Sequence, residues 1–337
     1  MRKILFGVCA ALLLSACTAS AEGSGPAPSG KSGMLLVGNK GEDTISFIDL
    51  ETGEEISREA TGKEPHEIAI SPDGRLAAVV SFGGESIDLF DTAARKKVET
   101  IMLSPNKRPH GIAWLNDGRI VATTEGSDSI TVVSPPDGET GKRTITSLST
   151  AQKGSHMLAV SPSRDRIYVS NMQSGTVSVI DFRKKRKITD LTAGREPEGL
   201  ALTPNGKRLL VADRQEDILY VFDTESLTEI TALETGKFPI RVAVSPDGRL
   251  AVTSNLGDGA LGLYDLEKLE PMPPIIVSGD PRAAQVTILF SDDGQTIYAA
   301  ETGTNRVAEV NIESGTVVRR LPAGTKGDGL GIVSAIP

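Results

Sequence analysis

Cysteine is scarce in this sequence of 337 residues, which contains only Cys9 and Cys17. Cys9 lies in an apolar N-terminal run typical of an export signal, so the exported chain would keep Cys17 alone and form no internal disulfide. The sequence also lacks a phosphate-binding glycine loop, the GxSxG and HExxH motifs and a CxxCH haem-attachment motif. These absences exclude P-loop chemistry and covalently attached haem, but they leave non-covalent cofactors open.

Long hydrophobic runs are missing too, because no segment after the N-terminus is long enough to span a bilayer. The N-terminus has a positively charged start, MRK, and a short apolar run, ILFGVCAALLLSA, which predict an export signal over residues 1–16. The segment from Leu14 to Cys17 resembles a bacterial lipobox, which implies cleavage before Cys17 and attachment of lipid to it. The alternative is an ordinary signal peptide with an incidental cysteine.

The segment that follows, residues 17–33, is rich in Gly, Ser, Ala and Pro and predicts a flexible tether. Thr18 stands where lipoproteins retained in the inner membrane often carry Asp. The resemblance therefore implies an exported protein that is anchored to the membrane by lipid on Cys17. In a Gram-negative host, its expected place is the periplasmic face of the outer membrane.

Positive charge is in short supply, since the formal net charge is −8 and becomes −10 without Arg2 and Lys3. An acidic chain is not typical of nucleic-acid-binding proteins, so no nucleic acid partner is expected. One local exception is RKKRK at residues 183–187. It is interpreted either as lysine-rich protection of an exposed sheet edge or as a binding patch.

An internal repeat of roughly 42 to 47 residues dominates the sequence. Each unit has an apolar run such as EIAI, a turn such as SPDG, a second run such as LAAVVS, a third such as SIDLFD, and a less apolar fourth segment. The six turns begin at Ser71, Leu115, Ser161, Thr203, Ser245 and Ser291. Four short β-rich runs per unit predict the four-stranded blade of a β-propeller.

The two ends of the repeat region complement each other. From Met34 the chain reads MLLVGN, TISFID and EEISRE, which match the last three strands of a unit, and it ends with GDGLGIVSAI, which matches a first strand. Joining them completes one further blade and leaves no unpaired edge between the chain ends. The sequence therefore predicts an all-β, seven-bladed propeller over residues 34–337, closed by pairing of the N- and C-terminal strands in one blade.

Short motifs within the repeat carry a family resemblance. IYVSN at Ile167–Asn171 is close to the YVTN signature, and both the SPDG turns and the aspartates that end the third strands match the same repeats. Nearly all of residues 34–337 thus resembles the YVTN (YncE-like) propellers of bacteria and archaea. This resemblance implies the fold but not an activity, because the wider set of such propellers includes amine-dehydrogenase-like and haem-d1-type proteins.

Histidine occurs only three times, as His66, His110 and His156, each at the same register in three consecutive units. This position opens the innermost strand, so its copies should surround one mouth of the central channel. Around the ring it holds His66, His110, His156, Glu198, Ile240, Val286 and Asp328. Closure makes Asp328 a neighbour of His66, so five consecutive blades offer imidazole or carboxylate groups, the ligand types of Zn, Cu, Fe or Mn.

Two interpretations of this ring stay open. The five polar members predict a site for one transition metal or a small anion, or a general acid or base. Ile240 and Val286 favour the other interpretation, a packing stripe that ends in a water-filled polar mouth. Arg241 and Arg282, in the blades without histidine, are candidates to orient an anion. Secondary candidates on the same face are Asn171, Asp213 and Glu301, at the ends of the second strands.

Two classes of function follow. The preferred hypothesis is a non-catalytic, monomeric binding or scaffold module of the cell envelope that holds a ligand, a metal or a partner protein at its channel face. The alternative is a metal-dependent lactonase or lyase, or a redox enzyme, because seven-bladed relatives include lactonases with acid, His and Arg residues at the channel mouth. In that enzyme Glu198 or Asp328 would serve as the base beside a metal on the histidines.

Overall fold

The computed structural model describes residues 31–163 and 165–334. The expected signal segment, Cys17 and most of the expected tether lie outside these residues. The described chain contains no helix with both the length and the apolar character needed to cross a membrane.

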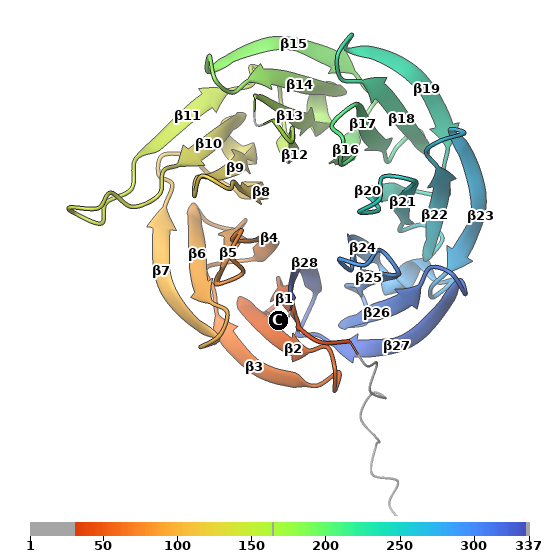
Figure 1. The fold of residues 1–337 in the computed structure, drawn as a ribbon, viewed down its shortest axis with the longest axis horizontal. Coiled ribbons are helices and arrows are strands. Elements are labelled where there is room, and N and C mark those ends of the chain that lie inside the picture. Colours follow the sequence, from red (N-terminus) through yellow and green to blue (C-terminus); the bar gives the residue numbers. More distant parts are fainter. Residues whose placement is uncertain (1–30, 164, 335–337) are drawn as a thin grey trace, which may run out of the picture.

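Seven antiparallel sheets of four strands each are arranged around a common centre (Figure 1). Blade 1 joins the two ends of the chain and consists of β28 (Gly327–Val333), β1 (Met34–Asn39), β2 (Thr44–Asp49) and β3 (Glu55–Ala60). Blade 2 consists of β4 (Pro65–Ile70), β5 (Leu76–Ser81), β6 (Ser86–Asp91) and β7 (Lys96–Met102). Blade 3 consists of β8 (Pro109–Trp114), β9 (Ile120–Thr124), β10 (Ser129–Val133) and β11 (Ile145–Ser149).

The other four blades repeat this order. Blade 4 consists of β12 (Ser155–Val160), β13 (Arg166–Asn171), β14 (Thr176–Asp181) and β15 (Arg186–Thr192). Blade 5 consists of β16 (Pro197–Leu202), β17 (Arg208–Asp213), β18 (Ile218–Asp223) and β19 (Thr228–Glu234). Blade 6 consists of β20 (Pro239–Val244), β21 (Leu250–Asn255), β22 (Ala260–Asp265) and β23 (Glu270–Ile276). Blade 7 consists of β24 (Gln285–Phe290), β25 (Thr296–Glu301), β26 (Arg306–Asn311) and β27 (Thr316–Pro322). Three short 3₁₀ helices occur in the described loops: η1 (Glu125–Ser127), η2 (Met172–Ser174) and η3 (Pro281–Ala283).

The ring closes as the sequence predicted. β28 pairs antiparallel with β1, from Met34 opposite Val333 to Asn39 opposite Gly327. The innermost strands contact one another in cyclic order, and β28 lies between β24 and β4. The seven-bladed, all-β prediction is therefore confirmed, including closure by the two ends of the chain.

The apolar core is divided among the blade interfaces. Each of seven clusters of buried side chains combines residues from two neighbouring blades. The cluster between blades 3 and 4, for example, joins Val121 and Ile130 to Val169, Ile180 and Phe182. Among the described residues every such cluster spans two blades, so the blades stabilise one another around the ring.

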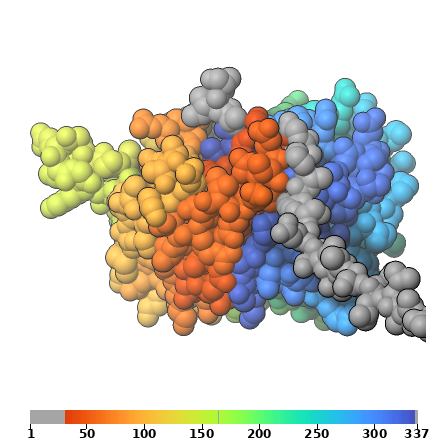
Figure 2. All heavy atoms as spheres, turned by 90° about the horizontal axis from the view of Figure 1, so that it is seen from below, coloured from red at the N-terminus to blue at the C-terminus, as the bar shows by residue number. Residues whose placement is uncertain are grey.

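The SPDG turns have the structural role expected from their residue types. Ser71 Oγ donates to Asp73 and accepts the amide N–H of Leu76, and Gly74 has a φ of 72°. The aspartate therefore holds the turn, and the glycine supplies a backbone conformation that other residues rarely adopt. Blade 3 departs from the regular pattern, because the loop of residues 134–144 between β10 and β11 projects from the side of the molecule (Figure 2).

Candidate functional site

Every innermost strand has a β-bulge near its start. In blade 2 the pairing with β5 runs from Pro65 opposite Ser81 directly to Ile68 opposite Val79, which leaves His66 and Glu67 outside the regular register. Equivalent irregularities occur in the other six blades. A bulge bends the strand and redirects its side chains. It breaks the simple alternation along β4, so both His66 and Glu67 are buried near the centre of the ring.

The three histidines form a continuous stack. The ring centroids of His66 and His110 are 3.9 Å apart, and those of His110 and His156 are 3.6 Å apart. Phe82 lies against the first two rings, with its centroid 5.6 Å from His66 and 5.4 Å from His110. The three side chains come from consecutive blades and are all buried, His110 most completely at 1% exposure. The repeat therefore brings the histidines together, as predicted.

Carboxylates bind the two ends of the stack. At one end His66 Nε2 lies 3.3 Å from Asp328 Oδ2, and Lys40 forms an ion pair with the same oxygen while its Nζ is 3.3 Å from His66 Nε2. At the other end His156 Nδ1 lies 2.8 Å from Glu125 Oε2, and its Nε2 lies 3.4 Å from Glu198 Oε1. The end histidines thus have acidic partners, whereas His110 has no ion pair or hydrogen bond to its side chain in the described structure.

Arg241 connects opposite sides of the ring. Its Nη1 lies 2.8 Å from Glu198 Oε1 in the neighbouring blade 5, and its Nη2 lies 2.9 Å from Glu67 Oε1 in blade 2. Blades 2 and 6 are separated by two blades on one side of the ring and by three on the other. The guanidinium group therefore bridges two buried carboxylates across the centre.

These contacts set the protonation states of the cluster. Burial alone would raise the pKa of Glu198, but hydrogen bonding to His156 and the charges of His156, Arg241 and Arg214 lower that pKa to about 2. Burial would likewise lower the pKa of His156, yet its hydrogen bonds to Glu125 and Glu198 raise that pKa above the ordinary value. Burial, together with the charges of the flanking histidines, places the pKa of His110 well below its ordinary value. His110 is accordingly neutral while His156 favours its charged form.

Hydroxyl groups on the second strands hold the bulged backbone in place. Thr123 Oγ1 accepts the amide N–H of Gly111 at 2.8 Å and donates to the carbonyl oxygen of His156 in the next blade at 2.5 Å. Ser170 repeats this arrangement one blade further on, since it accepts from the amide of Met157 and donates to the carbonyl of Glu198. The backbone at His156 and at Glu198 is therefore held by the preceding blade.

Glycines at the bulges allow neighbouring inner strands to approach closely. A Cβ atom added to Gly329 would lie 1.7 Å from the carbonyl oxygen of His66, and one added to Gly199 would lie 2.7 Å from Cα of Arg241. Gly111 is similarly close to the backbone of His156 and Met157. A larger side chain at any of these glycines would push the next blade outward. The central residues of that blade would be displaced with it.

The other predicted site residues lie outside the stack. Arg282 is in η3, with its side chain 90% exposed and paired to Asp280. Asn171 donates to Ser178 within its own blade, and Glu301 pairs with Arg320. Asp213 accepts the backbone amides of Glu196 and Gln215. Ile240 and Val286 are buried apolar side chains, as the packing interpretation expected for those two positions. Glu125 and Arg214, which lie beside the ends of the second strands, do reach the cluster.

Sequence reasoning missed Glu67. The register position after the histidine holds Glu67, Gly111, Met157, Gly199, Arg241, Thr287 and Gly329. Glu67 and Arg241 are the only charged residues at this register position, and they have opposite signs in opposite blades. This pairing of charges was the signal in the sequence that could have indicated their contact. The alternation of apolar residues along the innermost strand did not predict the bulge, which brings two adjacent side chains toward the centre.

The orientation of the three stacked rings prevents all three histidines from binding one metal ion. Because an imidazole binds a metal through the lone pair in its ring plane, three stacked rings do not direct their nitrogens at one common point. A smaller group does converge: ligand atoms of His66, Glu67 and His110 all lie within 4.8 Å of one another. Nδ1 of His66 lies 3.6 Å from Glu67 Oε1, and neither this atom nor the buried Nδ1 of His110 has a hydrogen-bond partner in the described structure. Two imidazoles and a carboxylate form a ligand set that Zn²⁺ commonly accepts.

Comparison with known families agrees with this architecture. The sequence model of "Lactonase, 7-bladed beta-propeller" matches residues 58–268, which is more than half of the chain. The chain belongs to this lactonase family of seven-bladed propellers. No match was found among curated proteins. The narrower resemblance to YVTN propellers stays a prediction.

Solved structures extend the likeness to nearly the full length of the chain. A functionally unknown protein from Desulfotomaculum acetoxidans is similar with a TM-score of 0.77 and 16% identity, over 90% of this chain and 99% of that one. Kuenenia stuttgartiensis hydrazine synthase gives a TM-score of 0.71 and 18% identity, over 89% and 99% of the two chains. The dihydro-heme d1 dehydrogenase NirN is similar with a TM-score of 0.67 and 15% identity, over 90% of this chain and 77% of that one. At such identities the likeness establishes the fold alone.

Proposed function

We propose that this lactonase-family propeller is a binding protein of the cell envelope whose centre holds one divalent transition-metal ion, Zn²⁺ or Cu²⁺. The proposed ligands are Nδ1 of His66, Nδ1 of His110 and a carboxylate oxygen of Glu67. The observation that carries the proposal is that two buried Nδ1 atoms without hydrogen-bond partners lie beside that carboxylate, with Nδ1 of His66 3.6 Å from Glu67 Oε1. Buried polar atoms are rarely left without a partner, and a bound cation would satisfy both.

The surroundings of the two imidazoles support metal binding. Nε2 of His66 lies 3.3 Å from both Asp328 Oδ2 and Lys40 Nζ, and in the tautomer that carries its proton on Nε2 the free lone pair of His66 is on Nδ1. The low pKa of His110, which burial and the neighbouring histidines cause, keeps this side chain in the neutral form that a metal requires. Asp328 is thereby a positioning residue behind His66 rather than a direct ligand.

The third histidine has a different role in this proposal. Both ring nitrogens of His156 face carboxylates, and hydrogen bonds to those carboxylates raise its pKa. A charged imidazole has no lone pair for a metal. His156 and Glu198 therefore form a buried ion pair that fixes the side of the cluster opposite Asp328.

The ionised groups around the axis nearly balance one another in charge. The carboxylates of the connected network are Glu67, Glu125, Glu196, Glu198 and Asp328, and its permanent cations are Lys40, Arg108, Arg214 and Arg241. Together with the charged His156 these cations match the five carboxylates, so the proposal rests on the converging ligand atoms and not on an excess of negative charge. Glu67 would remain in contact with Arg241 through the same side chain.

The burial of the cluster favours ion binding over turnover of a small organic substrate. His66, Glu198 and Arg241 are all at most 5% exposed and are paired with other members of the cluster. A lactone ring would have to displace the Arg241 bridge before it reached an acid or base. A dehydrated metal ion needs no such opening.

Elemental analysis of the purified protein, prepared without a histidine tag, tests the proposal. We expect near-stoichiometric metal in the wild-type protein or after loading with Zn²⁺ or Cu²⁺, and its loss in His66→Asn and His110→Asn. His156→Asn is the matched control, because it removes an adjacent ring of the same stack and should retain the metal. Absence of metal from the loaded wild-type protein, or equal loss from all three variants, would contradict the proposed ligand set.

A second candidate function rests on the family match. Glu125, His156 and Glu198 form a carboxylate–imidazole–carboxylate array beside Arg241, and these residue types are suited to lactone hydrolysis or lyase chemistry. A panel of lactones and esters, assayed with metal-loaded and metal-free protein, tests this function. Turnover that His156→Asn abolishes would support it, whereas wild-type activity no higher than that of the variants would exclude it for those substrates.

The envelope location is part of the proposal and rests on the lipobox-like segment before Cys17. Metabolic labelling with a radioactive fatty acid should mark the wild-type protein and not Cys17→Ser. Incorporation of label in both proteins, or in neither, would argue against a lipid anchor at this residue.

A further inference from the structure

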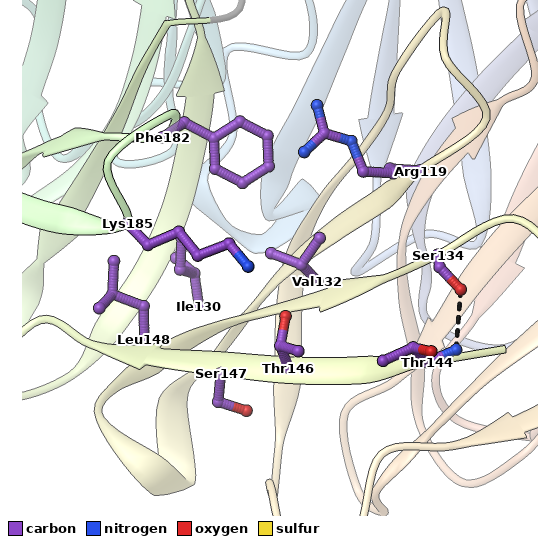
Figure 3. A pocket seen from close by; sticks show the side chains of 10 residues that line it. All are labelled: Arg119, Ile130, Val132, Ser134, Thr144, Thr146, Ser147, Leu148, Phe182 and Lys185. Atoms are coloured by element: carbon purple, nitrogen blue, oxygen red, sulfur yellow. Dashed lines mark hydrogen bonds between the residues drawn. The ribbon is translucent and has the colours of Figure 1, made fainter.

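A groove lies on the outer rim of the propeller, between β10 and β11 of blade 3 and the β14–β15 turn of blade 4 (Figure 3). Its volume is about 350 Å³, and its floor is formed by Ile130, Val132, Leu148 and Phe182. This volume lies within the usual range for pockets that bind small molecules, roughly 300–1,000 Å³. The groove belongs to the outer strands, so it is separate from the histidine cluster at the centre.

The floor is an uncovered part of the apolar core. Ile130 and Phe182 are buried members of the cluster between blades 3 and 4, whereas Val132 and Leu148 pack against that cluster but stay half-buried. Blade 3 differs here because the long loop of residues 134–144 precedes β11, which has only five residues. The outermost strand therefore leaves apolar side chains accessible.

Two cations face this apolar floor. Arg119 Cζ lies 4.4 Å from the centre of the Phe182 ring, and its guanidinium also pairs with Asp117. Lys185, in the RKKRK stretch, extends over the groove with its amine close to the β10 side chains (Figure 3). Among the residues that the structure describes, no carboxylate forms an ion pair with Lys185.

We propose that the groove binds a linear, medium-chain carboxylate. Its alkyl chain would lie along Ile130, Val132 and Leu148, and its carboxylate would pair with Lys185. The lining includes Ile130, Val132 and Ser134 along one extended segment, which spans roughly 13 Å at about 3.3 Å per residue. The unpaired ammonium group of Lys185 favours an anionic head group over a neutral one. It is a local positive charge on a protein whose net charge is negative.

Calorimetric titration with decanoate, kept below its micelle concentration, tests this proposal. We expect saturable 1:1 binding to the wild-type protein, and no saturable binding of acetate, which has the head group without the chain. Decanol, which has the chain without the charge, should bind about fivefold more weakly, in line with the loss of one partly exposed ion pair.

Two variants and a matched control locate the ligand. Lys185→Gln should weaken decanoate binding about fivefold, and Leu148→Asp should abolish it. Lys184→Gln removes the adjacent lysine of the same turn, whose amine faces Asp181 at 3.7 Å, and should leave the affinity unchanged. Circular dichroism would verify that Leu148→Asp is folded. Absence of saturable binding to the wild-type protein, or equal affinity in wild type, Lys185→Gln and Leu148→Asp, would overturn the proposal.

Discussion

Arg241 Nη2 lies 2.9 Å from Glu67 Oε1, although the two residues come from opposite sides of the propeller. Both side chains are buried, and the same guanidinium binds Glu198 of the neighbouring blade. The centre of the ring is therefore held by a charge network that crosses it. The free energy of unfolding should depend strongly on this network, because each partner would otherwise be a buried, unpaired charge.

Arg241→Met tests this dependence. It would leave Glu67 and Glu198 buried without their shared cation, and loss of one partner of a buried ion pair costs about 3–5 kcal/mol. Urea denaturation should show a decrease of this size in the free energy of unfolding. Arg282→Met is the control, since its ion pair with Asp280 is exposed and should leave the unfolding midpoint unchanged. Equal midpoints for the two variants would show that the bridge does not stabilise the ring.

Gly329→Ala tests the close approach of blades 1 and 2. The added Cβ would lie 1.7 Å from the carbonyl oxygen of His66, and the backbone must shift to relieve this contact. Overpacking typically costs about 1–3 kcal/mol, and a backbone clash at the closing blade should reach the upper end. Gly138→Ala, at a site with no atom within 4 Å, is the matched control in the same denaturation series. A loss of stability no larger than that of the control would contradict the packing account.

Thr123→Val tests the hydroxyl that links blades 3 and 4. Valine has a similar shape but leaves the amide of Gly111 and the carbonyl of His156 without their shared partner. A buried unsatisfied group costs about 1–3 kcal/mol, so thermal or urea unfolding should show a loss in that range. Thr146→Val, on the exposed face of β11, should have little effect. If both variants were equally stable, the hydroxyl would have no supporting role.

The opposite pKa shifts of two histidines predict opposite pH dependences in the metal-free protein. The raised pKa of His156 stabilises the fold fully below its unfolded value of 6.5, and this contribution is lost as pH rises through the folded pKa. The lowered pKa of His110 means that the unfolded chain binds the proton more readily, so stability falls as pH drops below 6.5.

Urea denaturation between pH 5 and pH 9 checks both signs. The stability advantage of wild type over His156→Asn should shrink toward pH 9. The advantage of wild type over His110→Asn should shrink toward pH 5. The same pH trend in both comparisons would refute the protonation states assigned to the stack.

The repeat made the fold predictable from the sequence. Turn motifs such as SPDG at Ser71 recur in register, and the incomplete units at Met34 and Gly327 match each other. The register also placed His66, His110 and His156 in consecutive blades at one position, and the structure brings their rings together. These features depend on local pattern and counting, which a single sequence contains.

Details of the site depended on geometry that the pattern did not contain. The bulge at Pro65–Ile68 brings Glu67 to the centre beside His66, whereas regular alternation would direct adjacent side chains to opposite faces. The reach of Arg241 across the ring likewise depends on the spacing of the assembled blades. The groove near Phe182 depends on how β11 packs after its long loop, which composition does not determine.

Zinc K-edge X-ray absorption on the loaded protein tests the central claim most directly, because it reports the ligands of the metal themselves. The account predicts two imidazole nitrogens at about 2.0–2.1 Å together with oxygen ligands, and an unchanged spectrum in His156→Asn. His110→Asn should lose one imidazole contribution or the metal altogether. Three imidazoles in the wild-type spectrum, or a spectrum that changes in His156→Asn and not in His110→Asn, would contradict the assignment of His66, His110 and Glu67 as the ligands.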